Sequence, residues 1–518
     1  MDKLEEIKQM NLLKGKIFGI TRIVTVAIAL MLQVATMVVI VQVMHQYASA
    51  VYILLELSSV VLAFNLANDG KDYKSFWIVI VLVLPVFGYL MYFMWGHTSI
   101  NSSTNKRIRA AEKKAADFLK QDHQTIEELK RLHPNKVRIS RYLSLVGYPL
   151  YKNTQVRYFP LGDTMLKALA DDLRDAQKYI FLEYFIVSEG VIWSDIEQIL
   201  FDKAAAGVDV RIIMDDFGCI FINNRDFEDK MKRHGIKLVT FGRIHQDISR
   251  FSFNFRDHKK IAVIDGNIGY TGGVNLADEY ANIIERFGHW KDTGVRLYGE
   301  GVYSLTCFFL EMWETVTKTD SEDYKLYKPD IKIKAPGYVQ PYMGGPHKVR
   351  NNPSESAYTH TINKARDYLY ITTPYLVLDN KMREDIIDAA DSGVDVRIIT
   401  PKKYDKWYVH MVTISNYGYL MEHGVKIYEY SKGFIHAKNV ITDDECSICG
   451  TVNMDYRSFY LHYECGVIIN ENPAVMDMKK DFMDTMKESE KIDYEKWHNR
   501  PLRHKLIQWI LKVLSPML

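Results

Sequence analysis

The sequence predicts an α/β protein made of two tandem α/β/α sandwich repeats that face each other with pseudo-twofold symmetry, preceded by N-terminal transmembrane helices. Three observations support this prediction: a motif occurs twice with the same internal spacing, other segments recur around both copies, and long uncharged stretches are confined to the N-terminal region. Strands that alternate with helices are typical of α/β layers. Uncharged stretches of about 20 residues are typical of membrane-spanning helices.

Uncharged stretches in residues 1–96 predict a membrane anchor with two or three hydrophobic helices. Residues 23–44 and residues 75–95 carry no charge, and each stretch is long enough to cross about 30 Å of hydrocarbon as a helix. Residues 48–67 are also apolar but contain one glutamate and one asparagine, so they form a third span, a re-entrant piece or an interfacial helix. A cleaved signal peptide is the alternative for the first stretch, but the apolar run exceeds the usual length of about 7 to 15 residues. We therefore expect a multi-pass membrane protein.

Basic residues next to the anchor predict the side of the membrane on which the rest of the chain lies. Residues 105–141 contain eleven Lys or Arg against five Asp or Glu, and the positive-inside rule places such a segment in the cytoplasm. The basic N-terminal tail also favours the cytoplasm, which fits two or four crossings better than three. We interpret residues 97–141 as a basic linker, either a solvated helix or a segment that touches anionic lipid heads.

Two halves follow, residues 142–330 and residues 331–500, and their shared segments indicate a duplication. The run Gly-Val-Asp-Val-Arg-Ile-Ile starts at Gly207 and again at Gly393. Each half reads as a strand, a helix, an apolar strand, a helix, a strand and then the strand that carries the motif. The first two strands of each half are expected at residues 179–187 and 208–214, and at residues 368–376 and 394–400.

The last segment, residues 501–518, has the pattern of an amphipathic helix. Its leucines and isoleucines from Leu506 to Leu514 can share one face, while lysines and a glutamine lie elsewhere. Such a helix lies on a membrane surface or docks onto the core, and the sequence leaves both possibilities open.

Charge and cysteine content narrow the class of function. The formal net charge is +2 with 25% charged residues, so no overall basic field indicates nucleic-acid binding, which disfavours a nuclease. The five cysteines are an odd number without a dense framework, which fits a reducing compartment. Cys446 and Cys449 have metal-ligand spacing, but no second pair lies nearby, so we expect no zinc there.

The repeated motif has the form His-x-Lys-x4-Asp-x6-Gly-x-x-Asn. His and Lys are two residues apart beside an apolar run, so on a strand both side chains project from one face. A neutral imidazole beside an ammonium group suits attack on an anion, and the Asn adds a hydrogen-bond donor, so phosphate is the expected ligand. An ordinary edge strand explains one copy of this pattern but not two copies at identical spacing. The copies are His258, Lys260, Asp265, Gly272 and Asn275, and His436, Lys438, Asp443, Gly450 and Asn453.

Four carboxylates accompany the motifs. Asp265 and Asp443 follow the apolar strands and are expected to brace a turn more than to take part in chemistry. Asp292 and Glu464 lie 34 and 28 residues after the motif histidine of their own half. An acid among apolar neighbours needs a partner, so both are candidates to orient an imidazole. The alternative for each is an acid at the end of a surface strand.

The two motifs resemble the paired His-Lys-Asp (HKD) motifs of the phospholipase D superfamily, which meet in one active site. The hydrophobic N-terminal region, the Gly344-Gly-Pro346 element and the run Asn453-Met-Asp-Tyr-Arg-Ser458 make the chain similar to the bacterial cardiolipin synthases of that superfamily. The resemblance implies two phospholipase D-like domains in a bacterial cell membrane. It also implies a phosphatidyltransferase that converts two phosphatidylglycerol molecules into cardiolipin and glycerol through a phosphohistidine.

The resemblance also implies roles for the motif residues. His258 is the expected nucleophile and His436 the expected acid and base, while the lysines and asparagines surround the non-bridging phosphate oxygens. Phosphatidylglycerol and anionic membrane lipids are the expected partners, without nucleic acid, metal or cofactor. A lipase or nuclease and another phosphatidyltransferase are alternatives, because each uses the same His and Lys residues. The implied catalytic set is His258, Lys260, Asp265, His436, Lys438 and Asp443, with Asn275 and Asn453 as phosphate ligands.

Overall fold

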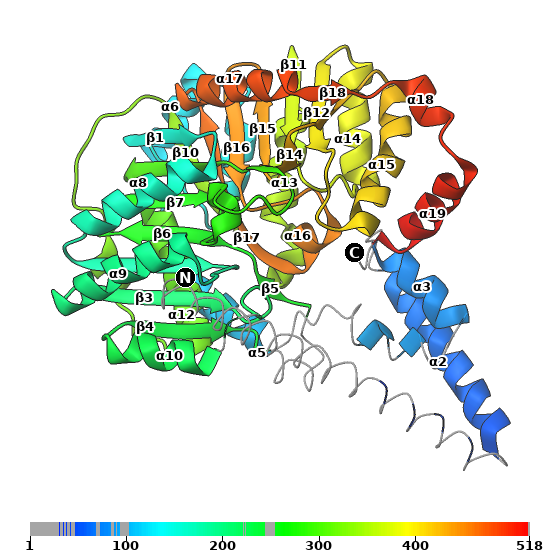
Figure 1. Ribbon diagram of the computed structural model, residues 1–518, viewed down its shortest axis with the longest axis horizontal. Helices are drawn as coiled ribbons and strands as arrows, with labels where there is room; N and C mark the ends of the chain where they lie inside the picture. Colours follow the sequence, from blue (N-terminus) through cyan, green and yellow to red (C-terminus); the bar gives the residue numbers. More distant parts are fainter. Residues whose placement is uncertain are drawn as a thin grey trace, which may run out of the picture.

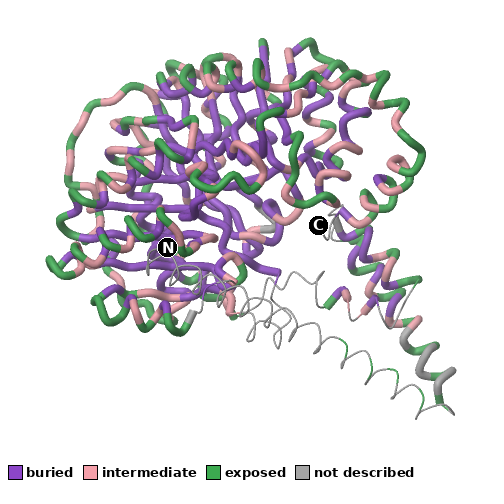
Figure 2. Tube along the Cα trace, in the orientation of Figure 1, coloured by how far each residue is buried: buried purple, intermediate pink, exposed green. Residues whose placement is uncertain are grey.

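The chain folds into two α/β repeats that lie side by side, with a pair of N-terminal helices beside the C-terminal helix (Figure 1). The computed structural model describes residues 48–68, 73–83, 103–220, 222, 224–243 and 254–515, and a few single positions before residue 94. In both repeats the strands are buried between more exposed helices (Figure 2). The two α/β repeats predicted from the sequence are confirmed.

The first repeat contains a seven-stranded mixed sheet in the order β1-β9-β7-β6-β2-β3-β4. Strands β2, β3 and β4 are parallel, whereas the motif strand β6 and its neighbours pair antiparallel. The parallel strands are joined by helices, as parallel connections require. The strands are β1 (Thr154–Phe159), β2 (Tyr179–Tyr184), β3 (Asp209–Asp215), β4 (Lys237–Phe241), β6 (Lys260–Ile264), β7 (Ile268–Gly272) and β9 (Gly294–Gly299). The helices are α8 (Gly162–Asp175), α9 (Val191–Ala205), α10 (Asn224–Arg233) and α12 (Val302–Thr317).

The second repeat has the equivalent strand order, β10-β17-β16-β15-β11-β12-β13, with β18 added at the edge. Strands β11, β12 and β13 are again parallel and β15 again pairs antiparallel with its neighbours. This strand-by-strand correspondence is what a duplication predicts. The strands are β10 (Tyr338–Gly344), β11 (Tyr368–Thr372), β12 (Asp395–Pro401), β13 (Lys426–Tyr430), β15 (Asn439–Thr442), β16 (Cys446–Gly450), β17 (His462–Asn470) and β18 (Ser489–Lys491). The helices are α13 (Pro353–Ile362), α14 (Asn380–Asp391), α15 (Trp407–Glu422), α16 (Tyr456–Tyr460), α17 (Ala474–Lys487) and α18 (Tyr494–His498).

Helix α12 fills the space between the repeats. It contacts β2, β6, β7 and β9 of the first repeat and β10 of the second. The helix is buried along nearly its whole length, and Phe308, Phe309 and Met312 have no exposed surface. Its apolar side chains belong to a cluster that includes residues of both repeats, so α12 joins the repeats in one hydrophobic core.

Two short strand pairs connect the repeats directly ahead of the motifs. Strand β5 (Arg256–Asp257) precedes the first motif and pairs in parallel with β17 of the second repeat. Strand β14 (Gly433–Ile435) precedes the second motif and pairs in parallel with β8 (His289–Lys291) of the first repeat. Each repeat therefore contributes the segment before its motif to a strand of the other repeat, as pseudo-twofold symmetry requires.

Residues 103–145, which include most of the basic linker expected at residues 97–141, form helices that pack against the repeats. Helix α5 lies on α12 and buries one face that includes Ile108, and Lys114 Nζ lies 2.6 Å from Glu314 Oε1. The many charges of α5 suggested a solvated helix, but its few apolar residues recur at helical spacing and form the buried stripe. The helices are α5 (Ser103–Ala115), α6 (His123–Leu132) and α7 (Val137–Leu145).

The N-terminal hydrophobic region is described only in part. Helices α2 (Ala48–Asn68) and α3 (Tyr73–Val83) form where hydrophobic helices are expected, and they pack against each other. Within the described residues, no helix combines the length and apolar composition that a membrane span needs, so the expected spans are not supported there. The stretch at residues 23–44 lies almost entirely outside the described residues, as does part of residues 75–95.

The C-terminal helix α19 (Leu502–Val513) is only partly docked. It packs on α15, with Leu511 against Val409 and Val412, while Leu514 contacts the cluster formed by α2 and α3. Ile507 is half-buried, and the other apolar side chains of the helix are exposed: Leu502, Leu506, Trp509, Ile510 and Val513. The helix thus docks onto the rest of the protein along only part of its surface.

Candidate active site

The short strand pairs β5–β17 and β14–β8 bring the two motifs close together. The backbone N–H of His258 donates to the carbonyl oxygen of Tyr463 (2.9 Å), and that of His436 donates to the carbonyl oxygen of Lys291 (2.7 Å). Both histidines lie just before the motif strands, not within them as the spacing predicted. The reason is that the backbone ahead of each motif strand pairs with the opposite repeat.

Each motif histidine is held by a carboxylate of the other repeat. Nδ1 of His258 lies 2.9 Å from Oε1 and 3.0 Å from Oε2 of Glu464, and Nδ1 of His436 lies 2.6 Å from Oδ2 of Asp292. Both carboxylates are fully buried. An ionised carboxylate can only accept, so Nδ1 carries the proton and the lone pair remains on Nε2. Spacing counted within each half does not reveal this exchange of partners.

The register of the short strand pairs explains the exchange. In β5 and β17, Asp257 pairs with Tyr463, so the residues that follow, His258 and Glu464, come next to each other. The pair formed by β14 and β8 ends one residue before the second histidine and its carboxylate, in the same arrangement.

The motif glycines let the neighbouring strand approach closely. Gly272 pairs with Gly294 and Gly450 pairs with Gly466. A Cβ on Gly272 would lie 2.4 Å from the Cα of Gly294, and a Cβ on Gly450 would lie 2.6 Å from the Cα of Gly466. Each orienting carboxylate lies two residues before the second glycine of these pairs. Side chains at the motif glycines would therefore displace the strands that hold the carboxylates.

The motif lysines lie beside the histidines. Nζ of Lys260 donates to the carbonyl oxygen of His258 (2.7 Å), and Lys438 makes the same contact with the carbonyl of His436. Burial lowers the pKa of Lys260 to about 7, with a further contribution from the positive charge of Lys438. Burial also lowers the pKa of Lys438 to about 8. A bound anion such as phosphate would raise both pKa values again and keep the two lysines in the ammonium form.

Both motif imidazoles are neutral at neutral pH. Burial lowers the pKa of His258 well below its usual range, and the charges of Lys260 and Lys438 lower it further. Burial and the charge of Lys438 lower the pKa of His436 to about 4, although Asp292 opposes this shift. The charge of Lys438 reaches His258, so the two motifs lie close to each other. A neutral imidazole with its lone pair on Nε2 can attack phosphorus or accept a proton.

The motif asparagines lie in the same region but differ in their contacts. Oδ1 of Asn275 accepts from the backbone N–H of Ile186 (3.0 Å), and its Nδ2 donates to the hydroxyl of Tyr280 (2.7 Å). Oδ1 of Asn453 is buried and has no hydrogen-bond partner among the described residues. The ring of Tyr280 also lies against the ring of His436, with centroids 5.8 Å apart. The first asparagine is thus fixed by protein contacts, whereas the second retains an unused polar atom.

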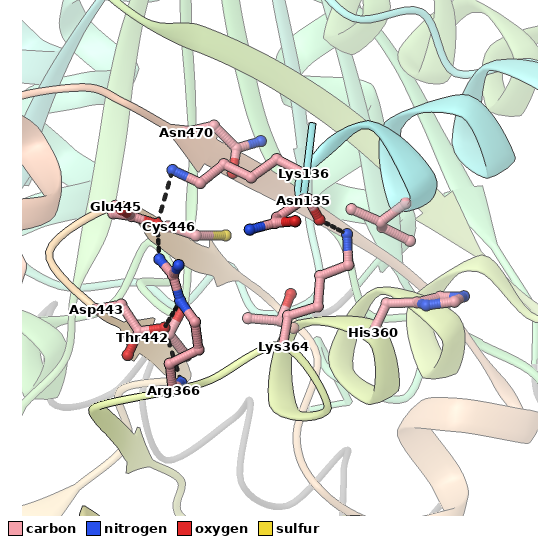
Figure 3. Close-up of a pocket in the computed structure, with 12 residues that line it drawn as sticks. Asn135, Lys136, His360, Lys364, Arg366, Thr442, Asp443, Glu445, Cys446 and Asn470 are labelled. Carbon is pink, nitrogen blue, oxygen red and sulfur yellow. Dashed lines mark hydrogen bonds and ion pairs between the residues drawn. The ribbon is translucent and has the colours of Figure 1, made fainter. Parts of the chain in front are cut away.

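The motif aspartates have a structural role, which corrects their place in the implied catalytic set. Asp265 accepts from three consecutive backbone N–H groups, of residues 177 to 179, at 2.7–3.0 Å. Asp443 accepts in the same way from residues 366 to 368, and the side chain of Arg366 lies beside it (Figure 3). These bonds tie the turn after each motif strand to the start of β2 or β11. None of them involves a motif histidine.

A cavity of about 330 Å³ lies beside Asp443, and Figure 3 shows its lining. Lys136 reaches across it to Glu445, with Nζ 3.1 Å from Oε2, while Lys364 donates to the backbone carbonyl of Asn135. None of the motif histidines or lysines lines this cavity, so it is not the place where the proposed chemistry occurs.

Sequence reasoning missed a third histidine in the site. His462 lies two residues before Glu464 on β17, so both side chains project from the same face of the strand. Its ring centroid is 5.4 Å from that of His258. Among the described residues, the one group of three side chains able to hold a metal ion is His258, His462 and Glu464. The alternation His-Tyr-Glu at the start of a strand was the signal available in the sequence.

Comparisons with known proteins identify the family. A family model described as a cardiolipin synthase, phospholipase D-like domain matches residues 169–285 and 358–486. The chain is 32% identical to cardiolipin synthase 2 of Bacillus anthracis over 88% of both chains. The chain belongs to the cardiolipin synthases of the phospholipase D superfamily. A Streptococcus mutans protein without an assigned function is also similar: it is 39% identical to this chain over 88% of this chain and 98% of its own length.

Two further comparisons extend over the fold and the N-terminal region. A second family model, described as a phospholipase D-nuclease N-terminal region, matches residues 57–97, which include most of α2 and all of α3. The solved structure of phosphatidylserine synthase from Haemophilus influenzae superposes with a TM-score of 0.59 over 74% of this chain and 100% of its own, at 14% identity. At that identity the likeness supports the fold alone. In this member of the cardiolipin synthase family, the phospholipase D-like fold therefore extends over both repeats.

Proposed function

We propose that this protein is a cardiolipin synthase that transfers a phosphatidyl group between two phosphatidylglycerol molecules, giving cardiolipin and glycerol through a phosphohistidine. The observation that carries the proposal is the pair of neutral imidazoles, His258 and His436, each backed by a buried carboxylate and joined by two lysines in one site. Such a site can bind one phosphodiester and supply both a nucleophile and a proton carrier.

In the first step, Nε2 of His258 attacks the phosphorus of the donor lipid, and the bond from phosphorus to the glycerol oxygen breaks. His436 supplies the proton that leaves with glycerol. Burial holds His436 neutral, so binding of the anionic substrate must raise the pKa of His436, and the imidazole takes up a proton from solvent as the substrate binds. Lys260, Lys438 and Asn453 are proposed to face the non-bridging oxygens and to offset their negative charge.

In the second step, the primary hydroxyl of another phosphatidylglycerol enters where glycerol left. Now neutral, His436 takes the hydroxyl proton, the alkoxide oxygen bonds to phosphorus, and the bond from phosphorus to His258 breaks. One phosphodiester replaces another, so the reaction needs neither a nucleotide nor a divalent metal. Water at this step would give phosphatidic acid, which is the outcome for the hydrolase alternative.

The product formed from a single lipid tests the proposed function. Purified protein in phosphatidylglycerol membranes should form cardiolipin and free glycerol in equal amounts, without nucleotide or metal, because the phosphohistidine preserves the bond energy of the donor. Thin-layer separation of the lipids and an enzymatic glycerol assay give both yields, and a chelator should leave them unchanged. Phosphatidic acid as the main product would show that water is the normal acceptor and would favour the hydrolase.

We also propose that the protein is anchored to the bacterial cell membrane with its catalytic repeats on the cytoplasmic side, in contact with phosphatidylglycerol and other anionic lipids. The uncharged stretch at residues 23–44 is the proposed span. Exposed apolar residues support contact with lipid: Leu54, Leu57, Val61 and Phe64 on α2, and Leu506, Trp509 and Ile510 on α19. Leu514 joins α19 to the α2–α3 cluster, so both apolar surfaces lie on one side of the protein (Figure 1).

Two N-terminal deletions separate the anchor from the catalytic region. Removing residues 1–96 should give a folded protein with reduced turnover on bilayers, because the anchor concentrates the site at the lipid surface. Detergent-dispersed phosphatidylglycerol should restore much of that turnover. Removing residues 1–135 should instead destabilise the protein, because α5 covers α12. Thermal melting and product assays check both results; equal stability of the two deletions would contradict the packing role of α5.

A further inference from the structure

His462 is a largely buried histidine beside the proposed nucleophile, and the proposed reaction gives it no role. Neither of its ring nitrogens has a hydrogen-bond partner among the described residues, and its side chain is 11% exposed. Its nearest acid is Glu464, with Oε1 3.7 Å from Nδ1, which is too long for a hydrogen bond. Buried polar groups are nearly always paired, so an unpaired imidazole at this point indicates a ligand that the described residues do not supply.

Three donor atoms converge here. His258, His462 and Glu464 each offer one ligand atom, and these atoms lie within 4.8 Å of one another. Two imidazoles and one carboxylate are the donors that hold Zn²⁺ in sites with an open fourth position, at bond lengths of about 2.0–2.2 Å. Thr451 Oγ1 donates to Oε2 of Glu464, which supplies the fixed outer contact that metal-binding carboxylates usually have.

The pseudo-equivalent position in the first repeat lacks this second imidazole. Trp290 lies two residues before Asp292, as His462 lies two residues before Glu464. Its ring packs on the ring of His436, with centroids 5.5 Å apart, just as His462 packs near His258. The two halves of the site therefore share a histidine and a carboxylate, but only the His258 half has a third metal donor among the described residues.

We propose that His258, His462 and Glu464 form a binding site for a divalent transition-metal cation, with Zn²⁺ as the best fit, and that the bound cation inhibits the enzyme. The cation removes the lone pair that attacks phosphorus in either binding mode. At Nε2 it occupies that lone pair directly. At Nδ1 it replaces the proton shared with Glu464, and the ring proton moves to Nε2. The inhibitory effect rests on the proposed function, whereas the binding does not.

The neighbouring lysines set the strength of this binding. Lys260 and Lys438 oppose a dication and favour a phosphodiester in the same space, so substrate and cation exclude each other. We therefore expect reversible binding that inorganic phosphate and phosphatidylglycerol weaken. Since the cation is not used in the chemistry, a chelator should reverse the inhibition completely.

Calorimetric titration of Zn²⁺ into the tag-free, full-length protein in detergent micelles tests the site without any turnover. The wild-type protein should bind one equivalent that His462→Phe binds far more weakly. Loss of an outer contact alone costs about 10- to 100-fold in metal affinity, so loss of a ligand should cost at least about 100-fold. His462→Asn, with melting curves for both variants, separates loss of the ligand from loss of the fold. Co²⁺ in place of Zn²⁺ should give a visible absorption band that either variant removes.

A matched control comes from a histidine on the surface. Nδ1 of His423 lies 2.9 Å from Oδ2 of Asp391, a histidine–carboxylate pair without a third donor among the described residues. His423→Phe should leave Zn²⁺ binding and inhibition unchanged. Equal Zn²⁺ binding by the wild-type protein and both His462 variants would overturn the site. Inhibition that persists in those variants would place the metal effect elsewhere, and absence of turnover in metal-free protein would count against the proposed function instead.

Discussion

Replacing either His258 or His436 with alanine should reduce cardiolipin formation by at least about 10²-fold, because loss of an acid or base alone typically costs about 10²- to 10⁴-fold. His258→Ala should lose more, since it also removes the proposed site of the covalent intermediate. Turnover with phosphatidylglycerol carrying a radiolabelled phosphate measures both the rate and the labelled protein. Labelled protein should be absent in His258→Ala.

The leaving group separates the two roles. A phosphodiester with a p-nitrophenol leaving group does not need protonation, so it should restore formation of the labelled intermediate in His436→Ala but not in His258→Ala. His423→Ala is the matched control, because His423 also bonds a carboxylate but lies on the surface. A labelled intermediate on His436 in the His258 variant would reverse the proposed roles, and near-normal turnover in either variant would exclude a shared two-histidine site.

Glu464→Gln should inactivate His258, and Asp292→Asn should inactivate His436. In both cases the substituted carboxylate and the affected histidine belong to different repeats. The amide nitrogen of Gln or Asn donates to Nδ1, which forces the ring proton onto Nε2 and removes the lone pair used in the reaction. We expect losses of about 10²- to 10⁴-fold in turnover. The p-nitrophenyl substrate again discriminates: it should rescue intermediate formation in Asp292→Asn and not in Glu464→Gln.

The opposite rescue pattern would be the decisive negative result. Rescue of Glu464→Gln alone would mean that His258 transfers protons and that His436 attacks phosphorus. Thr451→Val is a useful companion, because Thr451 donates to Glu464 without touching either imidazole. It should lower turnover less than Glu464→Gln does, since the carboxylate and its charge remain in place.

The repeated arrangement of the fold could be predicted because its signals are local. Buried strands such as β3 and β12 carry the same apolar run, and each motif has fixed spacing, so the halves and the motif residues were identified from sequence pattern alone. The turn-bracing role of Asp265 and Asp443 also follows from their place after an apolar strand. In the structure, each aspartate braces the turn by accepting hydrogen bonds from three consecutive backbone N–H groups.

The contacts between the repeats could not be predicted, because no local pattern encodes them. His258 and Glu464 are 206 residues apart and meet through a two-residue strand pair whose register only the folded chain reveals. The packing of α5 on α12 could not be predicted for a different reason. The many lysines of α5 are typical of a solvated helix, and only its contact with α12 shows that the few apolar residues form a buried stripe.

Neither repeat could have worked as a separate gene product unless two copies met, because each motif histidine depends on the carboxylate of the other repeat. Two identical subunits would impose the same surroundings on both histidines. A single chain lacks that constraint: one histidine has Glu464 and His462 as neighbours, and the other has Asp292 and Trp290. A fused chain can therefore assign attack permanently to one histidine and proton transfer to the other, whereas in a symmetric homodimer either histidine can take either role.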